Sequence, residues 1–256
     1  GLALATASLA ACSPSSSDHG LAVVATTTQI CDYVTQIAAK SADISLDKTD
    51  AAGKSSHVGA QKDGAALAMS LTCLLAPNAS AHEHEMTPAQ TSALAQADVM
   101  AVSGVDLEHF LDDAVVSSGF KGRMVVTSGV LTAADIDNPG TPDPEGAYTI
   151  DRGSERVDVA PWPFPPEEAG EEPEFRFDPH VWTSPKGTRI QVANLGAGLA
   201  AAAPDAASSI NAATASYLED IDALDQWAAE AIATVPEGQR VLFTSHDAFG
   251  YFSRDY

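Results

Sequence analysis

Three histidines in this sequence stand where a folded chain could bring them together. His82 and His246 each follow a short apolar stretch, and His180 lies between two prolines after an acidic stretch. Imidazole nitrogens are good zinc ligands, and three of them leave a fourth coordination position for a carboxylate or a water. We therefore predict that these three side chains meet at one metal ion, although they are far apart along the chain.

Other polar residues near these positions have simpler interpretations. Asp247, beside His246, could orient a ligand histidine, and capping or surface exposure would explain it equally well. Glu108 is assigned no ligand role. The remaining histidines are not interpreted as ligands. His19 belongs to a polar tether and His57 to an unassigned polar stretch. His84 is expected to be a solvated neighbour of His82, and His109 a structural helix residue.

The elements that must position these residues alternate between strand and helix. The alternation is typical of an α/β fold with a parallel sheet, in which ligands bind at the carboxyl ends of the strands. Thr28 is predicted to cap the first helix, and Thr87 with Gln90 to form a capping box at the second. Segment 41–69 gives no clear prediction. Strands are predicted at 21–28, 70–75, 99–102, 123–127 and 240–244, and helices at 28–37, 87–96, 108–117, 185–203 and 204–235.

Two stretches depart from this alternation. Residues 137–178 are rich in proline and carry twelve acidic residues against three arginines, which predicts a long irregular insert with a possible hairpin around 147–159. Its charge could concentrate cations, and a solvated loop is the simpler interpretation. The helix predicted over 204–235 would span roughly 45 Å, a length typical of a stiff connector.

Composition and the N-terminal residues indicate the compartment. The 256-residue chain has a net charge of -22, which argues against nucleic-acid binding through phosphates. Residues 1–20 read as a signal-peptide remnant, a bacterial lipobox with Cys12 as the lipidated residue, and a tether; the apolar run is too short to cross a bilayer. In an exported chain Cys31 and Cys73 could form a disulfide, the alternative being two buried free thiols.

Five segments together resemble a known family. The sequence is similar to the zinc/manganese substrate-binding lipoproteins of ABC importers, the TroA-like family, in the family's own order. The two most specific motifs are Asp178-Pro179-His180-Val181-Trp182 and the stretch 246–252. The matching segments are AVVATTTQICDYVTQI, LLAPNASAHEHEMTP, DVMAVSGVDLEHFLD, DPHVWTSP and SHDAFGYF.

The resemblance implies an architecture and a ligand set. We expect two parallel-sheet lobes joined by a long rigid helix, with the metal in the cleft between them. The first lobe would span 21–204 and the helix 205–235. Residues 239–256 would form the start of a second lobe that is truncated at its C-terminal side. His82, His180 and His246 match the family's first three ligands, although Ser80-Ala81 replaces the usual Asp-Pro before the first. The family's fourth ligand, a late Asp or Glu, would lie beyond residue 256.

The resemblance also implies a role. We expect a monomeric, non-enzymatic binding protein, anchored by lipid on the extracytoplasmic face of the membrane, that captures Zn²⁺ and delivers it to an ABC permease. Because metal binding needs neutral imidazoles, affinity should fall as pH drops below about 6.5. The alternatives are a manganese-binding importer component, a zinc-dependent hydrolase and a surface adhesin.

Overall fold

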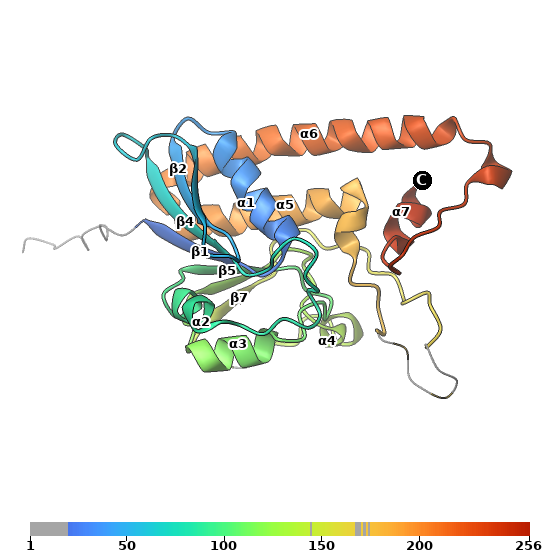
Figure 1. Ribbon diagram of the computed structural model, residues 1–256, viewed down its shortest axis with the longest axis horizontal. Helices are drawn as coiled ribbons and strands as arrows, with labels where there is room; N and C mark the ends of the chain where they lie inside the picture. Colours follow the sequence, from blue (N-terminus) through green and yellow to red (C-terminus); the bar gives the residue numbers. More distant parts are fainter. Residues whose placement is uncertain (1–19, 144, 167–169, 171–172, 174) are drawn as a thin grey trace, which may run out of the picture.

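The computed structural model describes residues 20–143, 145–166, 170, 173 and 175–256, and their centre is a seven-stranded sheet (Figure 1). The strand order is β3-β2-β4-β1-β5-β6-β7, and every pairing is parallel except that of β2 with β3. The strands are β1 (Leu21–Ala25), β2 (Ile44–Thr49), β3 (Ser55–Gly59), β4 (Leu67–Cys73), β5 (Val99–Val102), β6 (Arg123–Val126) and β7 (Thr149–Asp151). The predicted α/β class with a mostly parallel sheet is confirmed.

Helices cover both faces of this sheet, as Figure 1 shows. One core cluster joins α1 and the long pair α5 and α6 to one face, and a second joins α2 and α3 to the other. The helices are α1 (Thr28–Ala39), α2 (Pro88–Ala95), α3 (Leu111–Ser118), α4 (Ala133–Asp137), α5 (Pro185–Ala202), α6 (Ala207–Ala233) and α7 (Gly250–Asp255), with short 3-10 turns η1 (Val181–Thr183), η2 (Pro204–Ala206) and η3 (Glu237–Gln239).

Local signals place several helix ends close to where they were predicted. Thr87 and Gln90 form the predicted capping box at the start of α2. The cap of α1 is Thr27 rather than Thr28, because Thr27 has the extended backbone that lets its hydroxyl accept from the Ile30 amide. Helix α3 begins at Leu111 rather than 108, because the preceding residues form a loop around a buried glutamate.

Three sequence-based assignments were wrong or incomplete, in each case because strand pairing is a non-local event. Segment 41–69 contains β2 and β3, a hairpin that extends the sheet beyond β4. The hairpin suggested around 147–159 is absent from the described residues; β7 instead pairs in parallel with β6. Residues 240–244 form no strand and are exposed, since no described strand lies alongside to satisfy their backbone groups.

The long helical segment is divided by a turn. The sequence predicted one helix starting at Pro204. In the structure, residues 204–206 form η2, and α6 then continues for 27 residues, about 40 Å. Buried apolar residues of α6 pack into the main core cluster, and exposed ion pairs from Lys40 to Asp220 and from Arg189 to Asp222 add contacts. Beyond α6 the chain turns back and places α7 beside η1 (Figure 1).

The described residues contain a single sheet, so the second sheet that the resemblance implies is not among them. None of the helices described is both long enough and apolar enough to cross a membrane.

Candidate metal centre

His82, His180 and His246 come together in the folded chain. Each offers a ring nitrogen, and the three nitrogens lie within 4.8 Å of one another. Among the described residues this is the one group of three or more His, Cys, Asp or Glu side chains with such a geometry. His180 is 1% exposed, His82 is half-buried and His246 is exposed, so the group lies at the protein surface with one imidazole deeply buried.

The ring of His180 is oriented by a buried carboxylate. Asp178 Oδ1 lies 2.8 Å from His180 Nδ1 and 3.0 Å from the His180 amide nitrogen. Because a carboxylate accepts, Nδ1 carries the hydrogen and donates it, which leaves the lone pair on Nε2. That Nε2 lies 3.2 Å from Nε2 of His246. The arrangement is the carboxylate–histidine pairing that orients histidine ligands in metal sites.

The ring of His82 is oriented in the same sense by a backbone carbonyl. Its Nδ1 lies 3.2 Å from the oxygen of Leu107. A carbonyl can only accept, so Nδ1 carries the hydrogen and Nε2 carries the ring lone pair. Two of the three histidines therefore share one tautomer, and in both it presents Nε2 as the ligand atom.

The loop that supplies the Leu107 carbonyl is held by Glu108. This buried side chain accepts hydrogen bonds from the Thr26 hydroxyl at 2.7 Å and from the amides of Ser103 at 2.6 Å and Gly104 at 3.1 Å. Burial raises the pKa of the Glu108 carboxyl, while these donors act in the opposite direction. Glu108 thus fixes the β5–α3 loop rather than binding a ligand.

The same loop contains backbone strain. Val105 and Asp106 have φ of 57° and 55°, a left-handed conformation that is rare for a β-branched residue such as valine. Their amides donate to the oxygens of Val130 and Leu131, which hold the conformation in place. Strain of this kind persists only where surrounding contacts enforce it, and here it lies directly before the carbonyl that orients His82.

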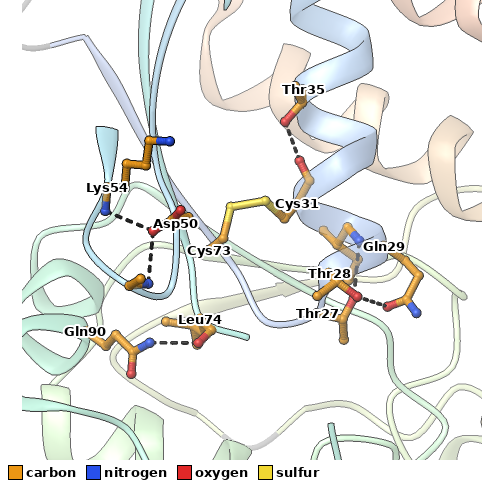
Figure 2. The surroundings of a disulfide bond; sticks show 12 residues. Thr27, Thr28, Gln29, Cys31, Thr35, Asp50, Lys54, Cys73, Leu74 and Gln90 are labelled. Atoms are coloured by element: carbon orange, nitrogen blue, oxygen red, sulfur yellow. Dashed lines mark hydrogen bonds between the residues drawn. A yellow bond between two sulfur atoms is a disulfide. The ribbon is translucent and has the colours of Figure 1, made fainter. Parts of the chain in front are cut away.

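The loop that carries His82 is anchored at both ends, and Figure 2 shows the disulfide and the Leu74 contact at its start. At its start, Cys73 is joined to Cys31 of α1 by a disulfide, the pairing that the sequence suggested. The next residue, Leu74, accepts a hydrogen bond from the Gln90 side chain at 2.7 Å. Gln90 also belongs to the capping box with Thr87 at the far end of the loop. One side chain therefore connects the two ends of the loop.

The segment beyond α6 reaches the site through α7. The Tyr251 hydroxyl donates to the Asp178 carbonyl at 2.7 Å and accepts from the Ala160 amide at 3.1 Å. Gly250 lies against the carboxylate, where an added Cβ would come within 2.5 Å of Asp178 Oδ2. The glycine and tyrosine of the 246–252 motif thus seat this segment on the residue that orients His180, and so bring His246 to it.

The spacing of two of the three rings fits ligands of one transition metal ion. On a tetrahedral zinc with bonds of about 2.0–2.1 Å, two ligand nitrogens lie about 3.3 Å apart. The 3.2 Å separation of the His180 and His246 Nε2 atoms is close to that value. Three neutral imidazoles leave a further coordination position, and the all-nitrogen donor set suits zinc better than hard cations such as magnesium or calcium.

The remaining histidines lie outside this group. His109 is exposed beside the site, with its ring centroid 5.8 Å from that of His82, so it is not simply a structural helix residue. The expectation that His84 is solvated was wrong: its ring packs on Phe110, and burial lowers its pKa. His57 lies on β3 and pairs with Asp47, away from the site. His19 and the proposed lipidation site Cys12 lie outside the described residues.

Sequence reasoning missed the residues that orient the ligands. It considered Asp247, which is exposed, whereas the carboxylate that orients His180 is Asp178. An Asp two residues before a His is the spacing of a local side-chain turn, so this contact could have been predicted. The Leu107 carbonyl could not, because no side-chain pattern marks it.

The fold and the site together define a class: an α/β protein with a mostly parallel sheet, one long helix and three imidazoles gathered in one place. The family described as zinc-uptake complex component A, periplasmic, matches residues 64–256. The chain belongs to this family of metal-binding substrate-binding proteins of ABC transporters, which confirms the resemblance seen in the sequence.

Individual relatives differ in the metal that they are named for. The manganese-binding lipoprotein MntA of Bacillus subtilis (strain 168) is 28% identical over 241 residues, which cover 94% of this chain and 60% of MntA. The iron-binding protein YfeA of Yersinia pestis is 28% identical over 182 residues, 70% of this chain and 47% of YfeA. The solved structure of the periplasmic zinc-binding protein TroA from Treponema pallidum has a TM-score of 0.60 at 23% identity, covering 93% of this chain and 64% of TroA.

These comparisons limit the alternatives. The chain spans 60% of the length of MntA and 47% of that of YfeA. The family consists of transport proteins rather than enzymes, so the hydrolase alternative is set aside. Metal binding is common to the relatives, whereas the choice of metal is not.

Proposed function

We propose that His82, His180 and His246 bind one Zn²⁺ ion and that the protein captures this ion for an ABC importer. The observation that carries the proposal is the convergence of three ring nitrogens within 4.8 Å. It is strengthened by the acceptors at Nδ1 of His82 and His180, which place the ring hydrogen of both residues on Nδ1. A histidine that only packs in the protein core would not require two other imidazoles beside it, whereas a metal ligand would.

Zinc is preferred over manganese on the chemistry of the donors. Manganese favours oxygen-rich sites, while imidazole suits zinc, copper, iron and nickel. Manganese remains the second candidate, because MntA, which aligns with 94% of this chain, is named for that metal. A fourth ligand with a carboxylate oxygen would move the site toward manganese.

The cellular setting follows from the same proposal. The protein would lie on the extracytoplasmic face of the membrane, anchored through lipid on Cys12, and would act as a monomer that delivers the ion to a membrane permease. Support comes from the Leu9-Ala10-Ala11-Cys12 stretch and from the lipoprotein name of the MntA relative. The disulfide between Cys31 and Cys73 suits an oxidising compartment.

Calorimetric titration of the metal-free chain tests the proposed site. Zinc should bind with one-to-one stoichiometry, and His180→Ala should weaken binding by at least about tenfold, as expected when an embedded ligand is lost. His57→Ala is the matched control, because it removes an imidazole from β3 without touching the site. Equal affinity of wild type and His180→Ala would contradict the assignment, and metal content after competition between Zn²⁺ and Mn²⁺ decides which ion is preferred.

A further inference from the structure

Aromatic side chains pack against two of the three imidazoles, those of His82 and His180. The ring centroid of Phe175 lies 4.9 Å from that of His82 and 6.2 Å from that of His180. Trp162 lies 5.8 Å from His180 and 5.1 Å from Phe175. Trp182 contacts His180 at 5.3 Å. We call Trp162 and Phe175, which come from the acidic insert, the aromatic wall.

The two residues lie on two segments of the insert that pair with each other. We call these segments, residues 160–162 and 175–178, its arms. Pro161 and Phe177 form an antiparallel bridge between the arms, and the Trp162 amide donates to the Arg176 oxygen at 3.1 Å. Below the bridge, the Asp178 amide donates to the Ala160 oxygen at 2.9 Å. The arms are therefore paired immediately next to His180, and the pairing fixes where both rings of the aromatic wall can lie.

The aromatic wall is also tied to the rest of the site. The Ala160 amide donates to the Tyr251 hydroxyl, which itself donates to the Asp178 carbonyl. One tyrosine thus connects the insert, the segment of His180 and α7, which follows His246. Phe175 is only 6% exposed although it belongs to a proline-rich acidic insert, because its ring packs against the imidazoles.

We infer that Phe175 and Trp162 are positioning residues that hold the ligand rings and keep water from the bound ion, and so slow its release. The inference rests on the proposed function. An ion leaves a site as water replaces its ligands, and apolar rings beside those ligands restrict that replacement. Affinity differences between closely related sites arise mostly in the dissociation rate, which is the quantity these contacts should control.

The size of the effect follows from the two histidine contacts of Phe175. Two aromatic contacts of ordinary strength together correspond to about a tenfold change in a rate or an equilibrium constant. Phe175→Ala should therefore speed zinc release about tenfold while changing association much less. Phe175→Leu keeps apolar cover at the same position and should lie between wild type and Phe175→Ala.

Stopped-flow transfer of zinc from the full chain to an excess of a fluorescent chelator measures the release rate. Phe164→Ala is the matched control, because Phe164 belongs to the same insert and its ring meets Trp162 at 5.0 Å rather than a histidine. It should stay within about twofold of wild type, because loss of a single indirect contact is worth little. Thermal unfolding of each metal-free variant shows whether the insert change has destabilised the whole fold.

Tryptophan emission reports whether zinc binds next to the aromatic wall. The chain has three tryptophans, of which Trp162 and Trp182 flank His180 and Trp227 is 65% exposed on α6. Zinc should alter the emission of the wild type, Trp162→Phe should reduce that change, and Trp227→Phe should preserve it.

The outcomes separate this inference from the proposed function. If the wild type binds no zinc, the proposed function fails. If the wild type binds zinc and Phe175→Ala releases it at the wild-type rate, the metal site stands and the role of the aromatic wall is refuted. Equal acceleration by Phe164→Ala and Phe175→Ala also refutes it, because the effect would then come from the insert as a whole. Faster release confined to Phe175→Ala, with Phe175→Leu intermediate, supports it.

Discussion

Replacement of Asp178 by asparagine tests the orientation of His180 separately from the folding of the chain. The carboxylate accepts from both the amide and Nδ1 of His180 through a single oxygen, Oδ1. Its other oxygen, Oδ2, is buried and has no hydrogen-bond partner among the described residues. Asparagine has the same shape but carries no charge, and one of its two polar ends is a donor.

Either orientation of the new amide weakens the metal site. If the amide oxygen faces His180, a charge-assisted hydrogen bond becomes a neutral one of about half the strength. If the amide nitrogen faces it, two donors oppose each other and the ring must change tautomer. Loss of a carboxylate that orients a metal-bound histidine typically costs about 10–100-fold in affinity. That range corresponds to about 1.4–2.7 kcal/mol.

Stability should respond differently from affinity. The aspartate buries a charge with one unpaired oxygen, and asparagine replaces it by a neutral group with one unpaired donor, so these costs largely offset each other. We expect the free energy of unfolding of the metal-free chain to change by less than about 1 kcal/mol. Calorimetry with zinc and urea unfolding without it measure the two quantities. Wild-type affinity in Asp178→Asn, or a loss of affinity matched by an equal loss of stability, would refute the reasoning.

Two further predictions concern the disulfide and the β2–β3 hairpin. The Cys31–Cys73 disulfide closes a loop with a sequence separation of 42. Replacing both cysteines by serine should therefore lower the free energy of unfolding by about 4 kcal/mol, because the disulfide restricts the unfolded chain. Urea unfolding measures this loss, and a loss below about 1 kcal/mol would contradict the prediction. The Asp47 carboxylate raises the pKa of His57 above 6.5, so the pair stabilises the fold at pH values below the unfolded-state pKa and loses that contribution as pH rises through the folded-state pKa. An NMR titration of His57 should show a raised midpoint that returns toward 6.5 in Asp47→Asn, and an unchanged midpoint in that variant would be inconsistent with the contact.

Much of the fold follows from local patterns in the sequence. The strand over Val99–Val102 was predicted with its observed bounds, because four consecutive apolar residues with a polar boundary on each side suit a strand buried on both faces. The capping box at Thr87 was also correct, since its residues lie within one helical turn of each other. Family membership rested on short motifs, which are likewise local.

Pairing between distant segments could not be obtained in this way. The β7 strand joins β6 in parallel across a gap of more than twenty residues, and no turn signal announces such a pairing. Residues 240–244 have the composition of a strand but no described neighbour to pair with. The strand predicted there from composition alone is therefore absent.

The candidate site divides in the same way. His82, His180 and His246 could be named from residue type and from the motif resemblance, because ligand chemistry belongs to the side chain itself. The positions of His82 and His246 after predicted strands added to this. Their tautomers, the Leu107 carbonyl and the aromatic wall required the tertiary structure. These features depend on distances between atoms that are far apart in the sequence, and such distances are set only when the β5–α3 loop, the insert and α7 pack together.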